Sequence, residues 1–239
     1  MQLTGPQGNA VVGLPHHVLA QLHRVVPVLG EDAEHVDDCV VDPIAVIRVG
    51  DCQCGGDYGQ PDPVITLPPG IAELTSVKRF VLYGSNLVRI PPEIGAMTSL
   101  EEFTPYTSYR LHWFPYEITR CSGLTRGTVS TRALFGNDKV RAPFPQLQPP
   151  RDSVADLTPT ALDPCRWGTT AVRSCSVCDQ PIELAGLHQV WISMRVATDV
   201  LPLLVNACSP ACVAALPGGA EDHPRFPHTG GRRAQVAGT

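Results

Sequence analysis

Four cysteines in the C-terminal part of the chain have residue types and spacings that suit a metal ion. Two residues separate Cys175 from Cys178, three separate Cys208 from Cys212, and 29 lie between the two pairs. Two close pairs of thiolates can surround one ion tetrahedrally, and Zn2+ binds such sulfurs at about 2.3 Å. The other interpretation is a set of buried or incidental thiols, which the double pairing disfavours. We therefore expect these four cysteines to bind Zn2+.

The composition of this cysteine set indicates a structural ion. Catalytic zinc sites leave one coordination position open and usually include histidine or carboxylate ligands, whereas four cysteines close the site. Bound metal would then supply folding energy that a unit of about 50 residues lacks on its own. A redox role for the first pair is less favoured, because no βαβ pattern surrounds Cys175. His188 is an alternative ligand, although an isolated loop histidine is more often solvated.

The cysteines fall at the ends of predicted elements. A turn-forming segment, 179–181, directly follows Cys178, and the alternation over 189–196 predicts a strand. Residues 211–216 have the pattern of a helix, with Pro210 in its first turn. This order of a knuckle, a hairpin and two ligands at a helix start resembles treble-clef zinc fingers. The resemblance implies that the first cysteine pair provides the knuckle ligands and the second pair the helix ligands.

A repeated pattern precedes this module. The segments LPPGI, IPPEI and FPYEI place Ile71, Ile94 and Ile118 at intervals of 23 and then 24 residues. Each unit can form one short strand and one return segment, but its apolar face is buried only when neighbours stack. The Pro-Pro pairs suit tight, non-helical returns because proline fixes φ and has no N–H. The same offset of 23 relates four more residues of the first copy to four of the second. In order, Leu74, Val77, Phe80 and Leu82 correspond to Met97, Leu100, Phe103 and Pro105.

Over about 65–147 this pattern resembles leucine-rich repeats of the short type, LxxLxxLxLxxNxLxxLPxxI. Serine replaces the usual buried asparagine at Ser85 and Ser108, and a hydroxyl can still bond the turn backbone. Pro105 falls at a strand position, where it would disturb the ladder, and Gly127 replaces an apolar core residue in the weaker third copy. So few copies need caps, which we assign to a strand at 44–49 and to the segments 128–134 and 140–148.

Strand residues that point away from the repeat core would form an exposed sheet face. Tyr83 and Tyr106 are 23 residues apart and would lie on neighbouring strands, flanked by charges. Exposed aromatic residues among charges are common in binding surfaces; the equal alternative is a solvated face whose tyrosines merely pair across strands. The predicted partner-binding residues are Lys78, Arg79, Tyr83, Glu101, Glu102, Tyr106 and Arg126.

Other polar clusters give weaker signals. Cys52 and Cys54, with Cys39 upstream, would need a fourth ligand for a second metal site, and none stands out, so incidental thiols are favoured. Cys121 falls at a repeat core position and should be a small buried hydrophobe. The chain contains none of the common nucleotide-binding, zinc-protease or hydrolase motifs, and we expect no enzymatic activity.

Composition limits the remaining classes. The chain has 239 residues, a net charge of -5, and 21 glycines and 24 prolines, which indicate many turns. The acidic balance makes nucleic acid an unlikely partner, no apolar run is long enough for a membrane span, and the absence of a signal sequence predicts a cytoplasmic protein with reduced thiols.

We therefore predict an α+β protein: a short leucine-rich-repeat solenoid with capping segments, followed by a small zinc-stabilised module. The expected function is a non-enzymatic scaffold that binds another protein through the repeat sheet, and the alternative is a zinc-finger nucleic-acid-binding or regulatory protein. The predicted divisions are an N-terminal extension and cap (1–63), leucine-rich repeats (64–148), a linker (149–163), a four-cysteine zinc module (164–217) and a disordered tail (218–239).

Overall fold

The computed structural model of the chain describes six stretches of residues: 65–67, 69–82, 87–136, 141–147, 174–182 and 186–231. The predicted N-terminal extension and cap, with the strand at 44–49, and the predicted linker at 149–163 lie outside the described residues. So do Cys39, Cys52 and Cys54. Within the described stretches, no helix is both long and apolar enough to cross a membrane.

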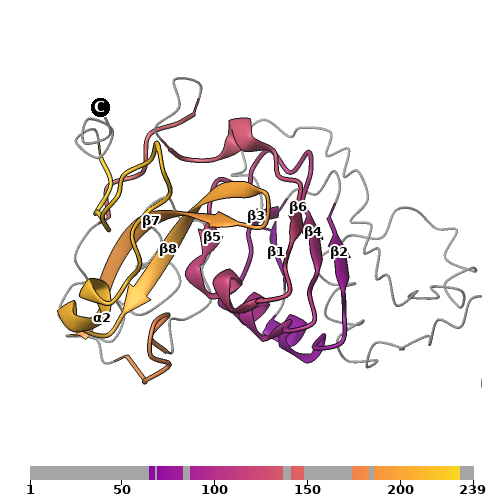
Figure 1. Cartoon of the computed structure of the whole chain (residues 1–239), viewed down its shortest axis with the longest axis horizontal. Coiled ribbons are helices and arrows are strands. Elements are labelled where there is room, and N and C mark those ends of the chain that lie inside the picture. Colours follow the sequence, from indigo (N-terminus) through magenta and orange to yellow (C-terminus); the bar gives the residue numbers. More distant parts are fainter. Residues whose placement is uncertain are drawn as a thin grey trace, which may run out of the picture.

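The repeated sequence units supply a three-stranded parallel sheet of strands β2 (Arg79–Val81), β4 (Glu102–Thr104) and β6 (Arg126–Gly127). Phe80 lies opposite Phe103 in the register of β2 and β4, so the 23-residue offset in the sequence is also the pairing offset. Between β4 and β6 the offset is 24 residues, as Glu102 pairs with Arg126. Figure 1 shows the three strands side by side.

Each proline-containing segment forms a short 3-10 helix: η2 (Pro69–Glu73), η3 (Pro92–Ala96) and η4 (Tyr116–Arg120), with a shorter η5 (Thr131–Ala133) after them. The prolines that precede η3 and η4 are extended, which ends the strand direction and starts the turn. The isoleucines at the repeat positions in η2, η3 and η4 are all fully buried. Stacked isoleucines therefore hold successive 3-10 helices together. These helices return the chain to the start of the sheet, so each strand runs parallel to the one before it.

Three further short strands each come directly before one of these 3-10 helices. Strand β1 (Ile65–Thr66) pairs in parallel with β3 (Leu87–Arg89), and β5 (Phe114–Pro115) follows β4 along the chain. We predicted that Pro105 would disturb the strand ladder, but β4 ends at Thr104 and Pro105 lies just outside it. Ser108 is buried and its hydroxyl donates to the Leu82 carbonyl at 3.2 Å, the backbone role expected for this position.

The apolar side of these strands is filled by phenylalanine. Phe80 and Phe103 have ring centroids 5.9 Å apart, and Phe114 meets Phe103 edge-on at 6.0 Å. All three side chains are buried in one hydrophobic cluster that also includes the isoleucines of the returns. In the third copy Gly127 supplies no side chain, and a Cβ at that position would lie 3.5 Å from the Cβ of Ala197, a residue of the C-terminal part.

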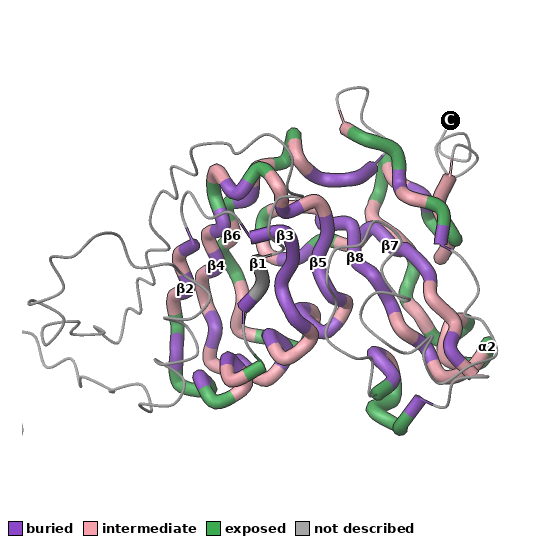
Figure 2. Tube along the Cα trace, turned by 180° about the vertical axis from the view of Figure 1, so that it is seen from behind, coloured by how far each residue is buried: buried purple, intermediate pink, exposed green. Residues whose placement is uncertain are grey.

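The C-terminal part is built on a hairpin of two nine-residue strands, β7 (His188–Val196) and β8 (Asp199–Ala207). Strand β8 also pairs in parallel with β5, so that Phe114 lies opposite Leu203 in a sheet of order β5-β8-β7. Figure 2 shows β3, β5 and β8 as buried chain in the middle of the molecule. The hairpin thus covers one end of the repeat strands and 3-10 helices within residues 65–136, which we call the repeat block. The predicted repeat and cysteine modules therefore share one sheet.

A second aromatic cluster lies beside this sheet and is closed by the C-terminal tail. It consists of Trp113, Phe135, Phe144, Leu147, Trp191 and Leu204. The tail pairs with the edge of β7 at His228, whose N–H and C=O both bond to Trp191, and Leu147 donates to the Thr229 carbonyl at 2.7 Å. The prediction of a disordered tail is therefore wrong for 218–231, because the open edge of β7 offers this segment backbone partners.

Taken together, the described residues form an α+β fold with small sheets. Assignment to the leucine-rich-repeat class stays a prediction.

Candidate metal centre and exposed strand face

The first cysteine pair lies in a tight loop, residues 174–181, which we call the knuckle. The Cys175 N–H donates to the Gln180 carbonyl at 2.8 Å, and the Asp179 N–H donates back to the Cys175 carbonyl at 3.0 Å. Asp179 adopts a positive φ of 61°, which aspartate tolerates better than most residues. Ser174 and Pro181 form a bridge that closes the loop, so the turn expected after Cys178 is present and aims two thiols to one side.

The second pair lies where a strand meets a helix. Cys208 directly follows β8, and Cys212 is in α2 (Pro210–Ala214), which begins with proline as predicted. The Ser209 hydroxyl caps this helix by accepting from the Cys212 N–H at 3.2 Å. The predicted strand over 189–196 is confirmed as most of β7, and the predicted helix is confirmed although it is shorter.

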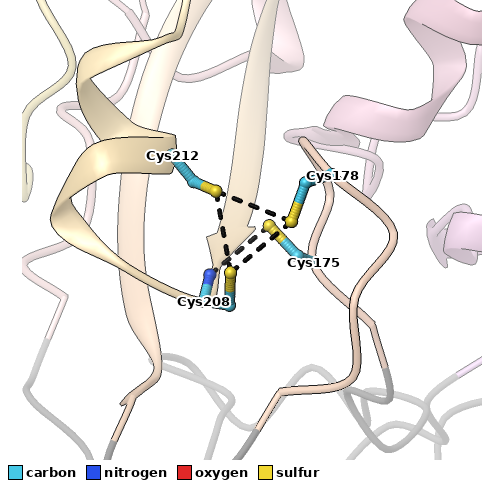
Figure 3. A group of neighbouring side chains, drawn as sticks. All are labelled: Cys175, Cys178, Cys208 and Cys212. Atoms are coloured by element: carbon cyan, nitrogen blue, oxygen red, sulfur yellow. Dashed lines mark hydrogen bonds between the residues drawn. The ribbon is translucent and has the colours of Figure 1, made fainter.

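These elements bring all four sulfurs together (Figure 3). The Sγ atoms of Cys178, Cys208 and Cys212 form a triangle with sides of 3.6 Å, and all four Sγ atoms lie within 4.8 Å of one another. A tetrahedral ion at about 2.3 Å from each sulfur would require sulfur-to-sulfur distances of about 3.8 Å. The geometry of the cluster therefore fits one metal ion at its centre.

The charges of the thiols support the same interpretation. Burial opposes ionisation of Cys175, but the N–H groups of Cys178, Val177 and Cys208 lower its pKa to about 7. Hydrogen bonds between the Cys208 thiol and the sulfurs of Cys178 and Cys212 favour its protonated form and raise its pKa to about 12. One site thus holds a readily formed thiolate beside thiols that resist ionisation. A divalent cation would remove that resistance.

The donor set is closed. Among the described residues, the cluster contains four cysteines and no histidine or carboxylate, so His188 is not part of it. Four protein sulfurs complete a tetrahedral shell and leave no position for water or substrate. This arrangement can hold an ion but offers no open site for chemistry.

The knuckle is also fastened to the repeat block. The Arg120 guanidinium on η4 donates to the Ser176 carbonyl at 2.9 Å and lies 2.6 Å from the Asp179 carboxylate. The Ser176 hydroxyl accepts from the Asn206 N–H at 2.9 Å and bonds to the buried carboxyl of Glu117. Sequence reasoning missed these residues, because no repeated spacing relates Arg120 to Ser176, which lies 56 residues later.

Glu117 is the unusual member of this contact. Burial raises the pKa of its carboxyl, and its Oε2 atom is buried without a hydrogen-bond partner among the described residues. Glu93 occupies the equivalent position one repeat earlier and adds to the rise through charge repulsion. The pair indicates that the carboxyl of Glu117 holds its proton more tightly in the folded chain than in the unfolded chain.

The outer side of the three parallel strands carries a row of ion pairs. Lys78 lies 2.8 Å from Glu101, Arg79 lies 3.0 Å from Glu102, and Arg126 reaches the same Glu102 carboxylate at 3.4 Å. The hydrogen bond and charge of Lys78 lower the pKa of Glu101. The structure thus brings five of the predicted face residues into contact across β2, β4 and β6.

Two exposed tyrosines lie in the loop that follows β4. Tyr106 is 44% exposed, and Tyr109, which sequence reasoning did not single out, is 66% exposed. The loop that carries them is pinned by a bond of 2.7 Å from the Thr107 N–H to the Ser130 hydroxyl. Tyr83, predicted to stack on Tyr106, lies outside the described residues. Two exposed tyrosines on a fixed loop add apolar area beside the charges.

Cys121 behaves as predicted for a core cysteine. Its side chain is buried, burial raises its pKa to about 11, and its thiol donates to the Ile94 carbonyl at 3.2 Å. This thiol is therefore inert and belongs to no metal site in the described part of the chain.

No protein-family model matches the chain. A search of curated proteins also finds no match.

Proposed function

We propose that this chain is a non-enzymatic scaffold that binds another protein through the outer face of β2, β4 and β6, and that Cys175, Cys178, Cys208 and Cys212 hold a structural Zn2+. The observation that carries the binding role is the row of charges across these strands, together with two exposed tyrosines in the loop that follows β4. Support for the class of protein comes from the resemblance to leucine-rich repeats, which are mostly binding scaffolds, and that step is an analogy at the level of the fold.

Zinc is the metal that the donor chemistry favours. Four soft thiolates in a tetrahedral arrangement select Zn2+ or an iron–sulfur centre over Mg2+ or Ca2+, which prefer oxygen ligands. The knuckle and the helix start place one pair of sulfurs each, as the resemblance to treble-clef fingers implies. When bound, the ion would cross-link the knuckle to α2, and the closed shell gives it no catalytic role.

The exposures on the face indicate the chemistry of the partner. The side chains of Lys78 and Arg126 are 62% and 65% exposed, whereas that of Glu102 is only 18% exposed. The single carboxylate of Glu102 is shared by two guanidinium groups. An approaching molecule therefore meets three cationic side chains and two carboxylates, of which that of Glu102 is largely covered and that of Glu101 is 45% exposed. The small excess of positive charge suits an acidic segment of a partner protein.

A comparison of two double variants tests the binding role. Arg126→Glu with Tyr106→Ala changes the face, and Arg225→Glu with Phe226→Ala is the matched control on the exposed tail. We expect proteins that are enriched by the wild-type chain to be lost with the first variant and kept with the second, and one purified partner to confirm the difference in a titration. Equal enrichment by both variants would contradict the proposal.

The titration also separates the alternative, a zinc-finger nucleic-acid-binding protein. Contacts to phosphates make the affinity for a nucleic acid fall steeply with salt concentration. The alternative would replace the proposal if a random-sequence duplex bound more tightly than any protein. Its affinity should then fall steeply between roughly 50 and 200 mM salt, as it does for proteins that contact phosphates.

A further inference from the structure

The β7–β8 hairpin touches the metal centre at one end and the edge of β6 at the other. In Figure 1 it runs from α2 across the molecule to β6. Nine residues at about 3.3 Å each give its strands a length of about 30 Å, so the cysteine cluster cannot contact β6 directly. Two connections join the knuckle to the repeat block, η4 through Arg120 and this hairpin, and the hairpin is the one that reaches the outer edge of β6.

At the metal end, the hairpin and the cluster are continuous. Cys208 is the residue after β8, and Ala207 pairs with His188 at the start of β7. The neighbouring Asn206 N–H donates to the Ser176 hydroxyl of the knuckle at 2.9 Å. An ion held by both cysteine pairs would therefore fix the ends of both strands against the knuckle and, through Arg120, against η4.

Along its length, the hairpin is docked on the repeat block. Strand β8 pairs with β5 at Leu203 and Leu204. The side chains of Ile192, Leu203 and Val205 are fully buried in the same hydrophobic cluster as Phe103. The hairpin is therefore a stiff body with apolar packing on its inner side.

At the far end, the tip of the hairpin completes the edge of β6. The Thr198 hydroxyl donates to the Gly127 carbonyl at 2.6 Å. The Asp199 carboxylate accepts from the Val129 N–H. Strand β6 has only two residues and pairs with β4 on one side alone, so these bonds supply partners that a sheet neighbour would otherwise provide.

We infer that the hairpin makes the order of β6, and with it the position of Arg126 on the binding face, depend on occupancy of the metal centre. Without the ion, the base of the hairpin keeps the Asn206–Ser176 bond but loses the cross-link between the cysteine pairs. Because the hairpin is stiff, a shift at its base displaces the tip from Gly127. A two-residue edge strand with no partner on its outer side opens readily. This inference rests on the metal site of the proposed function, and it goes further by making partner binding sensitive to metal supply.

Amide hydrogen exchange of the full chain tests this coupling without knowledge of the partner. The amides to follow are Arg126 N–H, which bonds to Glu101, and Thr128 N–H, which bonds to Phe103. We expect both to exchange at least about tenfold faster after zinc is removed by a chelator, because local opening sets the exchange rate. The Leu82 N–H, bonded to Thr104 on the far side of β4, should change much less.

Two matched variants separate the tip from the ion. Thr198→Val removes the bond to Gly127 and should speed exchange in β6 while the chain keeps its zinc. Thr119→Val removes a comparable hydroxyl bond, to the Tyr116 carbonyl in η4, and should leave β6 unchanged. Unchanged β6 exchange after zinc loss would overturn the inference alone. Uniform acceleration at all amides would also overturn it, because the ion would then support the fold as a whole. If elemental analysis found no metal in the folded chain, both the metal site and the inference would fall.

Discussion

The repeat block and the knuckle are held together by different forces. In the repeat block, Phe80, Phe103 and the isoleucines of the returns are fully buried, and each unit stabilises the next by apolar stacking. In the knuckle, Cys178, Asp179, Gln180 and Pro181 are all exposed, and Cys175 and Ser176 are its buried members. Apolar burial therefore explains the order of the first region, whereas the second needs the cross-link that its sulfurs can provide.

The largest difference between the two regions should appear when the metal cluster is broken. Cys175→Ser removes the buried sulfur that receives two backbone N–H bonds at 3.4 Å. We expect the knuckle to lose its order and the thermal midpoint to fall by on the order of 10 °C, as read by calorimetry. Cys121→Ala is the control: it changes a buried thiol of the repeat core and should keep the metal. A Cys175→Ser chain with unchanged metal content would break the comparison.

A core truncation in the repeat block should show the opposite pattern. Phe103 stacks on both Phe80 and Phe114, so Phe103→Ala leaves a cavity between neighbouring units. We expect the free energy of unfolding to fall by about 3–5 kcal/mol in denaturant titrations, with the metal content preserved. Loss of the metal in this variant would show that the two regions cannot be separated as described.

Glu117 lies in η4, where the repeat block meets the knuckle, so a change at this residue tests the contact between the two regions. Burial raises its pKa in the folded chain, so its contribution to stability is complete below the unfolded pKa near 4.5 and is lost as pH rises through the folded value. Glu117→Gln removes the charge and should raise stability at pH 7 by roughly 1–3 kcal/mol, the scale of a buried unsatisfied polar group. If the wild-type chain and Glu117→Gln had equal free energies of unfolding both at pH 4 and at pH 7, this prediction would be contradicted.

The smallest effect should come from the tail, which lies against the second aromatic cluster. Burial lowers the pKa of His228 from 6.5 to about 4, so docking of the tail is complete above 6.5 and weakens as pH falls toward 4. We expect the protection factor of the Trp191 amide, which bonds to His228, to fall over this range while the repeat strands stay protected. His228→Phe should abolish that pH dependence, and a wild-type tail that stays docked at pH 4 would refute it.

Local patterns predicted the pairing of elements where spacing is repeated. The 23-residue interval between Phe80 and Phe103 became the register of β2 and β4 because equivalent residues stack on equivalent residues. The four cysteines came together because a knuckle and a helix start each place two sulfurs on one side. The strand and the helix near the second pair were likewise predicted from alternation and from Pro210.

Contacts between distant, unrelated segments could not be predicted. Nothing in the spacing of Phe114 and Leu203 signals that β5 pairs with β8, because the contact depends on which strand edge is left open once each part has formed. The same holds for His228 at the edge of β7 and for Arg120 on the knuckle. The contacts of Phe114 and Arg120 are the ones that join the repeat block to the C-terminal part.

The most direct test of the account is the metal content of the full chain, purified without added metal, together with that of Cys178→Ser. We expect about one zinc per chain, bound by four sulfurs, and a loss of that zinc in Cys178→Ser with no loss in Cys121→Ala. A well-folded wild-type chain that contains no metal, even after incubation with zinc, would contradict it.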